Sequence, residues 1–135
     1  MSRILIAEDE EAIRGLVARA LSAVGHEVIA VGDGADARDV LGRQHGGFDL
    51  LLADIKMPVM DGIALALAAA RDYPDLTILL MTGYADQRER AHGLDALIHD
   101  VVTKPFTLAE IRGAVSSALA AGAQRAAERG AAPKV

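Results

Sequence analysis

Two kinds of apolar pattern alternate along the chain. Short runs that are apolar on both faces are typical of buried strands, and segments with apolar residues every three or four positions are typical of amphipathic helices. The short runs occupy residues 4–7, 27–31, 48–53, 76–81 and 97–103. Helical spacing follows each run, in residues 13–24, 36–43, 62–73, 86–92 and from 108 onward. The pattern predicts a strand and a helix repeated five times.

The ends of the helices are marked less evenly. Gly25 and Gly93 are placed to end the first and fourth helices, and Thr107 is a suitable N-cap for the last. The fourth helix, residues 86–92, is short and polar, so its pattern is weak. After residue 120 no large apolar residue occurs before Val135. We therefore expect a folded domain over residues 1–120 and a disordered tail over residues 121–135.

Strands that are apolar on both faces and alternate with helices predict a parallel sheet covered on both sides, which is a doubly wound α/β fold. Ligands of such sheets bind beyond the carboxyl ends of the strands. Five polar residues directly follow or end the predicted strands: Glu8, Asp9, Asp54, Thr82 and Lys104. Taken singly, an aspartate at a strand end is most often a loop or cap residue. Together they predict one polar site.

Three carboxylates at one edge would repel one another without a cation between them. Oxygen ligands without cysteine or histidine favour a hard ion, so we expect Mg²⁺. A carboxylate oxygen of Asp54 could then attack a phosphoryl group, whose oxygens the metal, Lys104 and the Thr82 hydroxyl would stabilise. The predicted product is an acyl phosphate on Asp54.

The amino-acid composition limits the classes of partner that the protein can bind. The 135 residues include 14 basic and 19 acidic side chains, for a net charge of −5, which disfavours nucleic acid and anionic membrane as partners. There is no cysteine, and the N-terminal apolar run is too short for a signal segment or a membrane span. We expect a cytoplasmic protein that acts through other proteins.

The motifs AEDE, ADIKMPVMDG, MTG and TKPF stand in an order and spacing that resemble the receiver domains of two-component response regulators, over residues 3–120. This resemblance implies the CheY-like, flavodoxin-like fold, a five-stranded parallel sheet in the order 2-1-3-4-5. It further implies that Asp54 is the phosphoacceptor, that Asp9 and Asp54 bind Mg²⁺ directly, that Glu8 holds the metal through water, and that the backbone carbonyl of Lys56 completes the set.

The same resemblance implies roles for five other positions. Lys104 would pair with the phosphoryl oxygens, and its bond to Pro105 would be cis. Thr82 would be the switch hydroxyl that turns toward the phosphoryl group. Pro58 and Gly62 would shape the loop and the turn that follow Asp54.

The chain departs from the usual receiver pattern at the switch. Val101 occupies the position where most receivers carry an aromatic residue. Tyr84, two residues after Thr82, follows a Thr-Gly pair as in single-domain receivers such as the CpdR-like proteins. We hypothesise that Tyr84 takes over the signalling role; a partly packed surface tyrosine is the alternative.

The favoured function is a stand-alone switch, phosphorylated by a histidine kinase or a histidine phosphotransferase. It would act as a monomer and bind a protein target through residues 83–105. The resemblance implies no enzyme activity beyond the switch's own phosphorylation and dephosphorylation. Three alternatives remain: a phosphate sink, a degenerate receiver, and a Mg²⁺-dependent phosphohydrolase of haloacid-dehalogenase type. The last expects a second aspartate two residues after the nucleophile, where this chain has Lys56.

Overall fold

The computed structural model describes residues 2–131. The expected alternation is confirmed, with every strand followed by a helix. The strands are β1 (Arg3–Ala7), β2 (Glu27–Val31), β3 (Leu50–Asp54), β4 (Thr77–Thr82) and β5 (Asp100–Thr103). The helices are α1 (Glu11–Ala23), α2 (Gly34–Arg43), α3 (Gly62–Asp72), α4 (Ala85–His92) and α5 (Leu108–Ala131). None of these helices is both long and apolar enough to cross a membrane.

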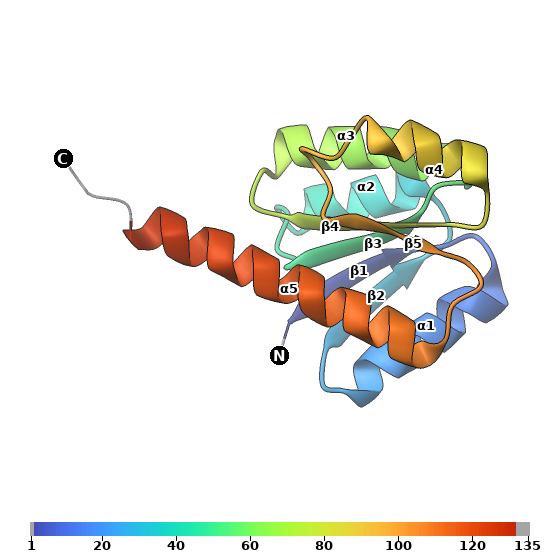
Figure 1. The fold of residues 1–135 in the computed structure, drawn as a ribbon, viewed down its shortest axis with the longest axis horizontal. Helices are drawn as coiled ribbons and strands as arrows, with labels where there is room; N and C mark the ends of the chain where they lie inside the picture. Colours follow the sequence, from blue (N-terminus) through green and yellow to red (C-terminus); the bar gives the residue numbers. More distant parts are fainter. Residues whose placement is uncertain (1, 132–135) are drawn as a thin grey trace.

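The five strands form one parallel sheet in the order β2-β1-β3-β4-β5, as expected. Helices α1 and α5 cover one face, and α2, α3 and α4 cover the other (Figure 1). Residues of the central strands alternate between the two cores, because neighbouring side chains on a strand point to opposite faces. Leu5, Leu51 and Leu80 pack on the α2–α4 side, whereas Ile6 and Leu52 pack on the α1–α5 side.

Local sequence accounts for the starts of α2, α3 and α5. The side chains of Asp33 and Asp61 accept hydrogen bonds from backbone N–H groups in the first turns of α2 and α3. Thr107 and Glu110 form a reciprocal capping box at the start of α5, where Thr107 Oγ1 accepts from the Glu110 N–H and Glu110 Oε1 accepts from the Thr107 N–H. The predicted N-cap at Thr107 is confirmed.

The fifth strand is shorter than the apolar run 97–103 predicts. Residues 94–98 form a turn instead, in which the N–H groups of Leu97 and Ile98 donate to the carbonyl of Leu94. Pairing with β4 begins only at Asp100, opposite Leu79. The side chain of Ile98 is still buried, which explains why the sequence pattern continued across the turn.

The structure also differs from the expected tail. Helix α5 does not end near residue 120 but continues to Ala131, and its C-terminal half extends past the sheet (Figure 1). Alanine is a strong helix former, and Arg125 and Arg129 attach this part of the helix to Thr77 and Asp75. The expectation of disorder is therefore wrong for residues 121–131, and residues 132–135 lie outside the described part of the chain.

Candidate functional site

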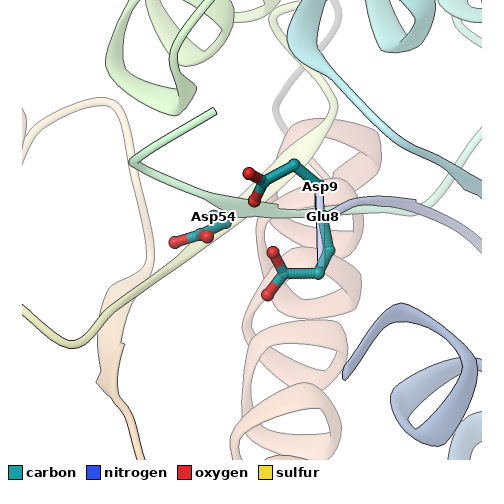
Figure 2. Close-up of side chains that lie close together, drawn as sticks. All are labelled: Glu8, Asp9 and Asp54. Atoms are coloured by element: carbon teal, nitrogen blue, oxygen red, sulfur yellow. The ribbon is translucent and has the colours of Figure 1, made fainter. Parts of the chain in front are cut away.

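The central strands β1 and β3 end side by side, so their terminal carboxylates meet. Glu8 and Asp9 directly follow β1, and Asp54 ends β3, paired with Met81 of β4. Glu8, Asp9 and Asp54 can each place a carboxylate oxygen within 4.8 Å of the others, and Figure 2 shows these three side chains close together. Glu8 and Asp54 are buried, and Asp9 is exposed. The predicted acidic cluster is present at the carboxyl edge of the sheet.

Lys104 supplies the positive charge in this cluster. Its ammonium donates to Oδ2 of Asp54 at 3.1 Å and also to Oε1 of Glu8. The side chain is 17% exposed and follows β5, so it reaches the acids from the opposite side of β4. The peptide bond between Lys104 and Pro105 is cis, as the resemblance implied.

The surroundings shift the pKa values of three groups. Burial raises the pKa of the Glu8 carboxyl, and the nearby Asp54 charge adds to this effect, while the hydrogen bond from Lys104 opposes it. Partial burial and the hydrogen bond with Glu8 raise the pKa of Asp9. Burial alone would lower the pKa of Lys104, but the bonds and charges of Glu8 and Asp54 raise it overall. Glu8 and Asp9 therefore hold their protons more tightly than in water, chiefly because burial disfavours their charged forms.

The donor set suits a hard divalent cation. Three carboxylates converge and Lys104 neutralises only part of their charge, so a cation placed among them would relieve the remaining repulsion. All the side-chain donors are oxygens, which Mg²⁺ prefers to nitrogen or sulfur. These residues fit the expected metal.

An open cleft of about 700 Å³ lies over the cluster. Besides the acids and Lys104, its walls are formed by Glu10, Lys56, Gly83 and Tyr84. The Lys56 ammonium lies 4.9 Å from the centre of the Tyr84 ring, which is a cation–π distance. The Tyr84 side chain is half exposed at the mouth of the cleft. Gly83 leaves the cleft open, as no side chain projects from it.

The loop between Asp54 and α3 folds closely against β3. Gly62 lies so near the strand that a Cβ atom at this position would come within 2.2 Å of the Asp54 carbonyl oxygen. Its N–H donates to the Ile55 carbonyl. Only glycine fits this approach, which gives Gly62 a steric reason in addition to the turn expected from sequence. Pro58 lies exposed in the same loop.

Two expected switch residues do not face the cluster. The Thr82 side chain is buried, and its hydroxyl donates to Oε1 of Gln87 on α4 at 3.1 Å. Val101 is half-buried against the apolar cluster under α4, away from the cleft lining. Sequence reasoning also missed Gln87 and Glu10. No spacing pattern marks either one, since both lie in polar stretches.

Comparison with known proteins agrees with this geometry. The family model of the response regulator receiver domain matches residues 4–116. CpdR of Brucella abortus, a response regulator receiver protein, is 38% identical over 121 residues, which cover 90% of this chain and 99% of CpdR. A probable transcriptional regulator, ycf27 of Porphyridium aerugineum, is 32% identical over 117 residues. The match covers 87% of this chain but only 48% of ycf27, so the chain spans about half the length of that relative.

A solved structure adds a third similarity. The response regulator TrrA of Thermotoga maritima, in complex with Mg²⁺ and BeF, superimposes with a TM-score of 0.77 and 29% sequence identity. The alignment covers 87% of this chain and 99% of TrrA.

Proposed function

Since this chain belongs to the response regulator receiver domain family, which serves two-component signalling, we propose that Asp54 is its phosphoacceptor. The phosphodonor would be a histidine kinase or a histidine phosphotransferase. One observation carries this assignment: Asp54 ends the central strand β3 with two carboxylates on one side and the Lys104 ammonium 3.1 Å away. The phosphohydrolase alternative is not favoured, because the family match and Lys56 both oppose it.

The transfer itself is a displacement at phosphorus. A carboxylate oxygen of Asp54 forms a bond to the phosphorus while the bond from phosphorus to the donor histidine nitrogen breaks. The electron pair of the broken bond stays on that nitrogen, which takes up one proton from solvent, so the histidine leaves as a neutral imidazole. Lys104, already bonded to Asp54, is placed to pair with the phosphoryl oxygens.

The acidic cluster would hold Mg²⁺ during this reaction. Asp9 and Asp54 would bind it directly, Glu8 through water, and Lys56 through its backbone carbonyl. When bound, the ion supplies positive charge that stabilises the phosphoryl oxygens as charge builds on them. Phosphorylation and dephosphorylation of Asp54 would be the chain's own chemistry.

The output would be a change in protein binding by residues 83–105. Helix α4 within this segment has a single buried residue, Ala91, so few apolar contacts resist its movement. The net charge of −5 favours protein partners over nucleic acid or membranes. We propose a monomeric switch that works in the cytoplasm.

Tyr84 would report the phosphorylated state in this segment. It stands at the cleft mouth next to Lys56, directly before α4, so movement of the β4–α4 connection would move its ring. Tyr84→Ala should still be phosphorylated but should bind its target equally in both states. If phosphorylation changed the target affinity of Tyr84→Ala as much as that of the wild type, this role would be contradicted.

The first test is intact-mass spectrometry after incubation with acetyl phosphate, with and without Mg²⁺. The wild type should gain one phosphoryl group only when Mg²⁺ is present, and Asp54→Asn should gain none. Asp49→Asn is the matched control, since Asp49 precedes the same strand at its other end and is exposed. It should be phosphorylated like the wild type. Steady phosphate release from unrelated phosphoesters without a phosphorylated protein would contradict the proposal and favour a hydrolase.

A further inference from the structure

The Thr82 hydroxyl makes two hydrogen bonds, both with residues at the start of α4. It donates its only proton to Oε1 of Gln87 at 3.1 Å and accepts a hydrogen bond from the Tyr84 N–H, also at 3.1 Å. The Thr82 side chain is 1% exposed, so water does not compete for this proton. The residue expected to contact a phosphoryl group is therefore committed to another acceptor.

This arrangement follows from how α4 begins. Tyr84 is the N-cap residue and offers no side-chain cap, and Gln87 is the third residue of the helix. In a capping box, a glutamine at this position accepts from the N-cap N–H. Here the Thr82 hydroxyl lies between the two, bonded to the Tyr84 N–H on one side and to the Gln87 amide on the other. The start of α4 is thus attached to the end of β4 through one hydroxyl.

We infer that Gln87 is a positioning residue that holds the Thr82 hydroxyl away from Asp54 in the unphosphorylated protein. This inference rests on the proposed function. A hydroxyl has one proton, and both the Gln87 carbonyl oxygen and a phosphoryl oxygen are acceptors. Thr82 can donate to only one of them, so binding of Thr82 to a phosphoryl group requires loss of the bond to Gln87.

The competition has a consequence for α4. When Thr82 turns toward Asp54, Gln87 loses its donor and the Tyr84 N–H loses its acceptor at the same moment. The side-chain link between the end of β4 and the start of α4 is then lost, and Ala91 is the one buried residue of α4, although Arg88 and Arg90 still contact Thr103 and Asp61. Gln87 therefore sets how readily the switch turns and couples that step to movement of α4.

The test measures binding of Mg²⁺ with BeF₃⁻, a phosphoryl analogue, by isothermal titration calorimetry. Gln87→Ala should bind it about two- to tenfold more tightly than the wild type, the range expected from loss of one competing neutral hydrogen bond. Glu89→Ala is the matched control, since Glu89 is an exposed residue of the same helix. It should bind like the wild type.

A double-mutant cycle separates positioning from a general effect on α4. In a Thr82→Ala background Gln87→Ala should change the affinity for BeF₃⁻ by less than twofold, because there is no hydroxyl to release. The same gain in both backgrounds would overturn the inference.

A second readout is taken on the free variant, with the free and BeF₃⁻-bound wild type as its two references. The ¹³C-methyl signal of Thr82 in the free Gln87→Ala protein should move toward its position in the BeF₃⁻-bound wild type. A free-protein signal identical to that of the free wild type, with unchanged affinity, would overturn the role of Gln87. If the wild type bound no BeF₃⁻, or bound it with the same affinity as Asp54→Asn, the proposed function itself would be refuted.

Discussion

The two edges of the sheet use charge in opposite ways. At the carboxyl edge Glu8 and Asp54 share the ammonium of Lys104, and Asp9 adds a third carboxylate beside them. At the amino edge two ion pairs join neighbouring segments: Arg3 contacts Glu27 at 3.0 Å, and Arg129 contacts Asp75 at 3.0 Å. These pairs join β1 to β2 and α5 to the residues before β4. The carboxyl edge keeps an excess of negative charge.

This difference separates stability from function. Matched pairs at an exposed edge contribute little each, but they leave no charge in need of a ligand. The unmatched acids at the other edge raise the energy of the free protein, and a bound cation would lower it again. A site that is electrostatically incomplete is therefore ready to bind, whereas a complete one is not. The comparison predicts which substitutions respond to Mg²⁺.

The largest effect should come from Lys104→Met. Removing the ammonium leaves Glu8 and Asp54 buried without a partner, which should lower the free energy of unfolding by about 3 kcal/mol in metal-free buffer. Added Mg²⁺ should recover part of the loss. Urea unfolding with and without the metal measures both effects. Arg71→Met, which removes an exposed ion pair with Asp72, should unfold at the same urea concentration as the wild type. A Lys104→Met protein as stable as the wild type without metal would contradict this account of the edge.

A smaller effect is expected at the amino edge. Arg125 donates to the buried hydroxyl of Thr77 at 2.8 Å, so Arg125→Ala should cost about 1 kcal/mol. Truncation after Ala120 should cost more, because it also removes the Arg129 contact with Asp75.

Neither loss at the amino edge should respond to Mg²⁺, unlike the loss in Lys104→Met. Gln124→Ala is the control on the same helix, since Gln124 contacts only the exposed Glu128 within the helix among the described side-chain hydrogen bonds. It should cost no more than about 0.5 kcal/mol. If truncation left the urea midpoint unchanged, the C-terminal half of α5 would not be docked as described.

The smallest effect concerns Glu8→Gln and its dependence on pH. Because the folded pKa of Glu8 is raised above its ordinary value of 4.5, protonation favours the folded state. The wild type should therefore match Glu8→Gln below pH 4.5 and become less stable than the variant as pH rises through the folded pKa. Melting temperatures of both proteins across this range measure the difference, which Mg²⁺ should reduce. If the melting temperature of the wild type instead rose relative to that of Glu8→Gln with increasing pH, this prediction would be wrong.

Much of the fold followed from local pattern. The five apolar runs predicted the strands, and the acids at their ends predicted the cluster, because strand polarity places all carboxyl ends of a parallel sheet at one edge. The predicted ends of strands and helices were wrong where tertiary contacts, and not local sequence, determine them. Ile98 is buried without belonging to β5, so burial alone extended the predicted strand.

The prediction of a disordered tail was wrong for the opposite reason. Residues 121–131 lack large apolar side chains, so no hydrophobic pattern indicated a docked helix. Their attachment depends instead on Arg125 and Arg129 meeting Thr77 and Asp75, which are distant in sequence. Polar contacts of this kind produce no periodic pattern of residues in the sequence.

By itself the sequence determined which residues gather at the carboxyl edge, since strands that alternate with helices form a parallel sheet and all end at one edge. Only the tertiary structure decided how those residues are connected. Lys104 bonds to Glu8 as well as to Asp54, and Thr82 donates to Gln87 rather than facing the acids. A hydroxyl or an ammonium chooses its partner by distance and direction in the folded protein, and spacing along the chain specifies neither.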